Sequence, residues 1–278
     1  MKDSLERSLL IASGLSNEKE IIRYIKRLDR LERGYHSKIK WKGTTKEKAM
    51  WLVDYIWGLN DSVKKESSLL TDSIDSVIRS EVVGDCLSLS SLYAVMGLRI
   101  GIEEIGVCHY PGHIFNFVCC EEGDILIDLT NPHMFNFSPY CDFKKGGLDL
   151  LISRVWNNRA NDLFEEDLDL AILYLEKALE IDPNCIEALA ISAPLYAQEG
   201  KLRLAFENIE KAIKLEPRLA KNYNLRAYVK EAAGDIEGAI QDVRSAIDLD
   251  PTDPDFSINL KELLEEWAQR DLNPRPPG

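Results

Sequence analysis

Apolar residues recur at three- and four-residue spacing in several stretches of the first half of the chain, and this spacing is typical of amphipathic helices. The expected helices cover about residues 16–34, 44–57, 69–79 and 86–98. We expect Ser16, Thr44 or Thr45, and Asp85 to act as N-caps, because their side-chain oxygens can accept hydrogen bonds from the free amides of a first helical turn.

The pattern changes beyond the last of these helices, where β-branched and aromatic residues gather in short segments. The segments 113–120 and 125–129 are rich in Val, Ile and Phe and are separated by a Glu-Glu-Gly-Asp turn. This composition and turn predict two antiparallel strands. The first half of the chain is therefore expected to be α+β.

The second half of the chain repeats itself every 34 residues. The positions that recur at this offset are prolines, alanines and glycines: Pro183, Pro217 and Pro251; Ala171, Ala205 and Ala239; Ala178, Ala212 and Ala246; Gly200 and Gly234. Alanine lets paired helices approach closely, and proline ends the second helix of a unit. The period therefore predicts helix–turn–helix units stacked in a row.

These residues resemble the tetratricopeptide repeat over 186–217 and 220–251. A degenerate repeat with helices near 151–164 and 168–181 precedes them, and a capping helix over 256–269 follows. Two positions depart from the family pattern: Pro194 falls inside a helix, where it should introduce a kink, and Lys230 replaces an aromatic residue.

The resemblance implies an all-α array that binds a protein or peptide partner in a concave groove. Lys221, Asn224 and Tyr228 are expected to face this groove as peptide-binding residues. A basic pair that could clamp a peptide carboxylate is not evident. The alternative left open is that the repeats only brace the first domain.

The length of 278 residues and an apolar fraction of 45% fit about two globular domains. We expect one domain over 1–150, the repeats over 151–270 and a disordered tail over 271–278. The net charge of −13 divides into −3 for residues 1–150 and −10 for residues 151–278. Because phosphate binding needs the opposite sign, no nucleic-acid partner is expected, although residues 19–48 carry 11 bases against 4 acids.

Neither a signal peptide nor an apolar run long enough to span a bilayer is apparent, so we expect a soluble cytoplasmic protein with no membrane partner. The six cysteines have no regular spacing, which indicates thiols rather than a disulfide framework.

Cys86 occupies the first turn of a predicted helix, directly after Gly84 and Asp85. The free amides and the positive end of the helix dipole favour a thiolate at such a position. A nucleophilic thiolate needs a base and a group that orients the base, and His113 and Asp128 lie on the two predicted strands. The two side chains lie on the same face of the hairpin only in one type of strand register. In that register, the numbers of two residues paired across the strands add up to an odd number.

The order Cys–His–Asp on helix, strand and strand resembles the transglutaminase-like superfamily, and residues 15–185 are similar to its SirB-type branch. The residues that carry the similarity are Gly84, Cys86, Leu87, Ser88, Leu89, Tyr93, Arg99, Gly101, Pro111, Gly112, His113 and the segment IDLTNP. The resemblance implies a papain/transglutaminase-like fold with Cys86, His113 and Asp128 as catalytic residues.

Two hypotheses of function follow. In the first, the protein hydrolyses or transfers acyl groups at amide bonds through a thioester on Cys86, and the repeats recruit a protein. In the alternative, it is a non-catalytic interaction scaffold that acts through its repeats. A zinc site among the Cys and His residues between 108 and 141 is a further option, but no spacing there matches a zinc motif, and no metal or other cofactor is expected.

Overall fold

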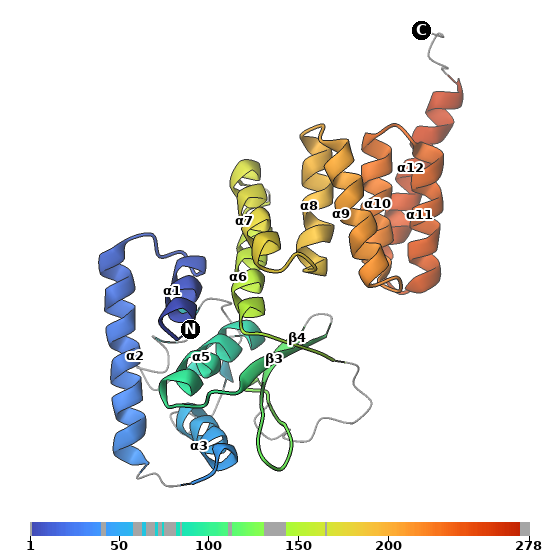
Figure 1. The fold of residues 1–278 in the computed structure, drawn as a ribbon. Coiled ribbons are helices and arrows are strands. Elements are labelled where there is room, and N and C mark those ends of the chain that lie inside the picture. The colour runs from blue at the N-terminus through green and yellow to red at the C-terminus, as the bar shows by residue number, and fades with distance from the viewer. Residues whose placement is uncertain are drawn as a thin grey trace. The chain divides into compact units, whose positions relative to one another are not determined.

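The computed structural model describes two compact units, Met1–Asn158 and Arg159–Gly278 (Figure 1). The division falls inside a helix, whereas the sequence predicted a boundary at residue 150. The described residues are 2–39, 43–57, 63–64, 70–71, 74, 82–83, 85–110, 113–130, 143–164 and 166–272.

The first unit is organised around one almost completely buried helix, α5 (Cys86–Arg99). It packs against the sheet strands β3 (Ile105–Tyr110) and β4 (His113–Val118), and it contacts the helices α1 (Lys2–Ala12), α2 (Glu18–Lys38) and α3 (Thr45–Trp57). Because α5 is surrounded on all sides, its small polar residues are buried too and bond to carbonyls. Ser90, for example, donates to the Ile114 carbonyl at 3.3 Å, and Ser91 donates to that of Leu87 at 2.8 Å.

The sheet has the strand order β5-β4-β3-β6, with β5 at Ile125–Ile127 and β6 at Lys144–Gly146, and every neighbouring pair is antiparallel. The predicted hairpin is therefore confirmed as β4 and β5. A separate parallel pair joins β1 (Val63–Lys64) to β2 (Val82–Val83). Strands as short as β1, β2 and β6 carry no alternation that a sequence pattern could detect.

The helix ends agree in part with the predicted caps. Asp85 caps α5 by accepting from the amides of Leu87 and Ser88, and Thr44 forms a reciprocal capping box with Glu47. The expectation for Ser16 is wrong, because Asn17 accepts from the Lys19 amide and starts α2 one residue later.

Two other helices differ from the sequence prediction. The structure adds α1, which the sequence analysis does not predict. Most of the helix expected over 69–79 lies outside the described residues, although Leu70, Thr71 and Ile74 are helical.

A buried ion cluster holds three helices of this unit together. The Arg99 guanidinium at the end of α5 donates two bonds to Glu6 of α1, at 2.8 and 2.7 Å. It also donates to Asp29 at 2.8 Å and Glu32 at 2.9 Å, both on α2. The side chains of Arg99 and Glu6 are only 4% and 3% exposed, so each charge depends on the other for its solvation.

The helices described in the second unit have the 34-residue register expected for the predicted repeats and the capping helix. They are α7 (Leu168–Ile181), α8 (Ile186–Gln198), α9 (Leu202–Leu215), α10 (Ala220–Ala232), α11 (Ile236–Leu249) and α12 (Pro254–Leu272), preceded by the end of α6 (Asp149–Asp162). The six repeated alanines are completely buried, as close helix pairing requires. Gly200 and Gly234 have φ of 73° and 85° in the turns between paired helices, a conformation that glycine adopts without strain.

The two departures from the repeat pattern are accommodated. α8 continues through the buried Pro194 to Gln198. Lys230 pairs with the buried carboxylate of Asp242 at 2.8 Å, and Arg226 binds the same carboxylate through two hydrogen bonds, at 2.8 and 2.7 Å. An ion cluster thus occupies the position where the resemblance implied an aromatic residue.

We predict that Arg99→Met lowers the local opening free energy of α5 by about 3–5 kcal/mol, because it leaves the Glu6 carboxylate buried without its cation. Hydrogen exchange of the α5 amides measures this change. The double variant Arg99→Met/Glu6→Met removes both charges and should restore most of the protection. Equal exchange in wild type and Arg99→Met would contradict the prediction.

Candidate functional site

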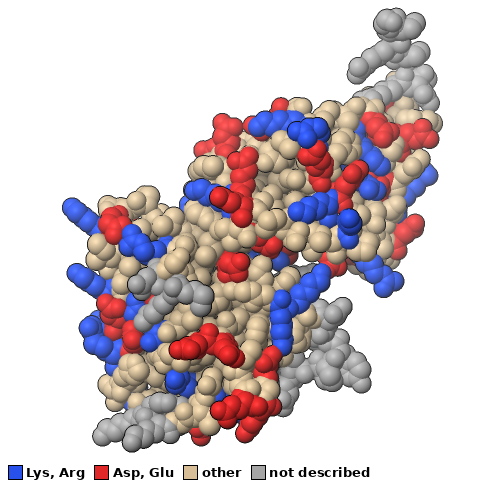
Figure 2. Space-filling model, in the orientation of Figure 1, with Lys and Arg blue, Asp and Glu red and all other residues tan. Residues whose placement is uncertain are grey.

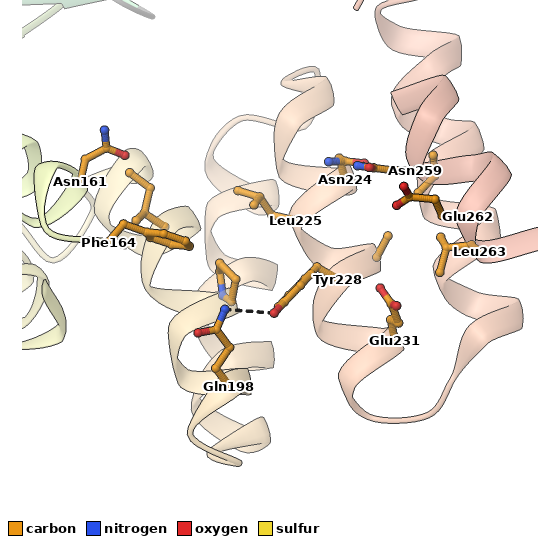
Figure 3. Close-up of a pocket in the computed structure, with 14 residues that line it drawn as sticks. Asn161, Phe164, Gln198, Asn224, Leu225, Tyr228, Glu231, Asn259, Glu262 and Leu263 are labelled. Atoms are coloured by element: carbon orange, nitrogen blue, oxygen red, sulfur yellow. Dashed lines mark hydrogen bonds between the residues drawn. The ribbon is translucent and has the colours of Figure 1, made fainter. Parts of the chain in front are cut away.

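A pocket of about 620 Å³ opens on the repeat unit, lined by side chains from α6, α8, α10, α11 and α12 and by Phe164 after α6 (Figure 3). Its lining follows the repeat register. Ile191, Leu225 and Asn259 are spaced by 34 residues, and so are Pro194, Tyr228 and Glu262. Successive helices therefore contribute equivalent positions to one surface, and α12 takes part as though it were a further repeat helix.

The lining of the pocket includes apolar and aromatic side chains. Phe164 is 37% exposed and Tyr228 is 40% exposed, although both are large apolar side chains. Figure 3 shows the Tyr228 ring between the Phe164 side and the α12 side of the pocket, with its hydroxyl accepting from Gln198 Nε2 at 3.0 Å. Exposed aromatic surface in the lining of a pocket is typical of a binding site.

Two of the three predicted peptide-binding residues line this pocket. Tyr228 is one, and Asn224 is the other, with its side-chain oxygen accepting from Asn259 Nδ2 at 3.0 Å. Lys221, one turn earlier on α10, is exposed and lies outside the lining, and its charge acts on Asp250 instead. Asn259, Glu262 and the other α12 residues of the lining were not predicted from the sequence, yet the 34-residue offset from Leu225 and Tyr228 leads directly to Asn259 and Glu262.

The charged residues of the lining are Glu231 and Glu262, and among the described residues that line the pocket there is no lysine or arginine. The basic clamp that the sequence did not reveal is thus absent from this lining as well.

The second candidate site lies where α5 begins, beside the β4–β5 hairpin. Asn116 pairs with Ile127 and Phe117 pairs with Leu126, so the numbers of paired residues add up to an odd number. In this register the side chains of residues 113 and 128 lie on the same face of the sheet. His113 Nε2 lies 2.7 Å from Asp128 Oδ2. The free, partly exposed Cys86 thiol hydrogen-bonds the His113 side chain.

The electrostatics of this cluster favour a protonated imidazole. The hydrogen bond to Asp128, followed by that to Cys86, raises the pKa of His113 to about 9. Burial acts to raise the pKa of Asp128, but hydrogen bonds from His113 and Thr130 outweigh it and lower that pKa. The Thr130 amide and hydroxyl hold Asp128 Oδ1 at 2.9 and 2.6 Å, which leaves Oδ2 to orient the ring.

The remaining cysteines do not share this environment. Burial raises the pKa of Cys108 to about 12, and it raises the pKa values of Cys119 and Cys120 as well. Within the described parts of the chain, no group of His, Cys, Asp or Glu residues is arranged to hold a metal ion; His133 and Cys141 lie outside them.

The basic stretch 19–48 falls largely on α2, where two of the acidic partners of Arg99, Asp29 and Glu32, also lie. Figure 2 shows Lys and Arg side chains interspersed with Asp and Glu over the face drawn, rather than gathered in one basic patch. None of the described helices is long and apolar enough to cross a membrane.

Comparison with known proteins identifies the class of the repeat region. The tetratricopeptide-repeat family model matches residues 163–185 and 220–253. With the 34-residue period and the stacked helix pairs, this match shows that the C-terminal region consists of tetratricopeptide repeats. The match begins at residue 163, so the transglutaminase-like fold expected for residues 1–150 stays a prediction.

Solved structures similar to the chain are tetratricopeptide-repeat domains. The first such domain of human RPAP3 is 21% identical, with 44% of this chain and 96% of that chain covered and a TM-score of 0.40. The first repeat domain of Spaghetti (RPAP3), bound to the HSP90 peptide SRMEEVD, is 22% identical, with 42% and 93% covered and a TM-score of 0.38. The Sgt2 domain from Aspergillus fumigatus is 19% identical, with 45% and 85% covered and a TM-score of 0.40. No curated protein matches the chain.

We predict that His113 titrates with a midpoint near pH 9 and that Asp128→Asn moves this midpoint toward 6.5, because a neutral amide no longer favours the imidazolium. NMR titration of the imidazole nitrogens measures both values, with the other histidines as internal references. The raised pKa contributes stability that is present below pH 6.5 and is lost as the pH rises through about 9. A wild-type midpoint near 6.5 would contradict this assignment.

Proposed function

We propose that this protein is an interaction protein that binds an extended protein segment in the pocket of its tetratricopeptide repeats. The observation that carries the proposal is the construction of the pocket: positions 34 residues apart on α8, α10 and α12 meet in one surface with exposed aromatic rings. Repeats that only braced another domain would not need solvent-exposed Phe164 and Tyr228 side chains in a concave lining.

The size of the pocket agrees with a peptide ligand. A volume of about 620 Å³ is within the range of sites that hold a few side chains. Asn161, Gln198, Asn224 and Asn259 place amide donors and acceptors along the lining, which an extended backbone can use.

We predict that Tyr228→Ala weakens binding of a selected peptide at least about tenfold, because aromatic anchors contribute most of the affinity in such interfaces. Peptides selected from a displayed random library on the full chain provide the ligands, and fluorescence anisotropy measures their Kd. The matched control is Ile258→Ala, since Ile258 is 53% exposed on α12 but is not in the lining. Equal loss in both variants would contradict a pocket-specific mode.

A second function is proposed for the first unit, on the observation that His113 bridges the Cys86 thiol and the Asp128 carboxylate. Cys86 would attack the carbonyl carbon of an amide, so that a C–S bond forms and the C–N bond breaks as His113 protonates the leaving amine. Water or an amine would then attack the thioester and give its proton to His113, which releases Cys86. Asp128 would hold the imidazole in the required tautomer throughout.

We predict that His113→Ala slows alkylation of Cys86 by iodoacetamide about tenfold or more at pH 7, because the thiolate loses the cation that favours it. Peptide mass spectrometry reads the rate at each cysteine. The partly exposed Cys119 is the internal reference, since it follows the end of β4 opposite His113 and should alkylate equally in both proteins. A rate at Cys86 that does not depend on His113 would remove this second function and leave the first intact.

A further inference from the structure

The helix α2 carries a basic row along its outer side. The members of this basic row are exposed and recur at alternating spacings of four and three residues: Lys19, Arg23, Lys26, Arg30 and Arg33. Residues at these spacings lie on one face of a helix, and the basic row spans roughly 20 Å along the axis. We propose that the basic row is a docking surface for an acidic helical segment of a partner protein.

The acidic residues of α2 do not neutralise the basic row. Glu18 pairs with Arg7 of α1 at 2.6 Å. Asp29 and Glu32 lie on the opposite side of the helix, where they bind the guanidinium of the buried ion cluster at 2.8 and 2.9 Å. The remaining acid, Glu20, is offset from the basic row by roughly a quarter of a turn. The two signs of charge are therefore sorted between the sides of α2, although they are mixed over the surface shown in Figure 2.

Other elements do not neutralise the basic row either. Among the residues that the structure describes, none forms an ion pair or a side-chain hydrogen bond with the side chains of the basic row. Like charges three and four residues apart destabilise a helix. The basic row therefore does not serve the stability of the first unit, whereas carboxylates brought by a partner would replace this repulsion with attraction.

The composition and spacing of the basic row fit a helical partner. Three of its five members are arginines, and a guanidinium can bind a carboxylate through two parallel hydrogen bonds. A helix with Asp or Glu at the same four- and three-residue spacing presents its carboxylates at the same rise as these bases. Ile22, one turn before Lys26, is 41% exposed and adds an apolar contact at the edge of the basic row.

The charge of the whole chain favours a short partner segment over an extended polyanion. The formal net charge is −13, so a nucleic-acid duplex or an anionic membrane, which extends beyond the basic row, would also approach acidic surface. A helical segment of about four turns ends where the basic row ends. An acidic protein segment therefore gains the local attraction without the wider repulsion.

The test uses two fluorescein-labelled helical peptides of about 18 residues and the full chain. One peptide carries Glu at alternating spacings of four and three residues, and the other has the same composition with its Glu residues distributed around the helix. We expect fluorescence anisotropy to show tighter binding of the first peptide. The double variant Lys26→Gln/Arg30→Gln should bind it about fivefold to tenfold more weakly, because two partly screened charge contacts are lost.

The matched control is Lys214→Gln/Arg218→Gln, which removes the same two residue types, at the same spacing, from exposed positions of the repeat unit. This control should leave the Kd unchanged, and circular dichroism checks the helix content of both variants. Equal weakening in the two double variants would overturn the proposal, because it would show a response to net charge alone. Equal affinity for the two peptides would overturn the helical geometry.

The same assay distinguishes the partner classes. Tighter binding of a single-stranded RNA oligonucleotide, a DNA duplex or phosphatidylserine vesicles than of the spaced Glu peptide would overturn the assignment to an acidic protein segment. Absence of binding to the peptide would overturn it as well. Neither double variant changes a residue of the repeat pocket, so these outcomes are independent of the binding function proposed for that pocket.

Discussion

The ion cluster around Arg99 is the contact on which the first unit depends. Arg99 ends the buried helix α5 and binds acids from two other helices, α1 and α2. At the other end of the same helix, Asp85 satisfies the first-turn amides, and Cys86 follows it directly. The helix α5 is therefore anchored at one end and capped at the other, and the strand β4 packs against its side. This arrangement gives Cys86 a fixed position relative to His113.

The repeat unit obtains its geometry in a different way. Buried alanines at a 34-residue period set the spacing of the helices, and the pocket follows because equivalent positions on successive helices face the same side. Each helix pair is held by its neighbours, and α12 extends the series by supplying Asn259 and Glu262 in register with Leu225 and Tyr228.

The sequence predicted what is periodic or locally encoded. The helices of the repeats, the hairpin register condition and the Asp85 cap follow from spacing and from the chemistry of single side chains. The prediction of Ser16 as the cap failed because the next residue, Asn17, is also a good capping residue, and only the chain path decides between them. The strand β6 and the contacts of Arg99 could not be predicted, because they join segments that are far apart in the chain and show no pattern of their own.

Burial separates the roles of the carboxylates in this protein. Glu6, Asp128 and Asp242 are all less than one-tenth exposed, and each is satisfied by bonds from within the chain: from Arg99, from His113 and Thr130, and from Arg226 and Lys230. Such acids fix geometry, because leaving any of them without its partner costs several kcal/mol. Glu231 and Glu262 are more exposed and line the pocket, where a carboxylate costs little to keep charged because water still solvates it. The buried acids therefore fix contacts within the fold, whereas the acids of the pocket lining contribute little to holding it together.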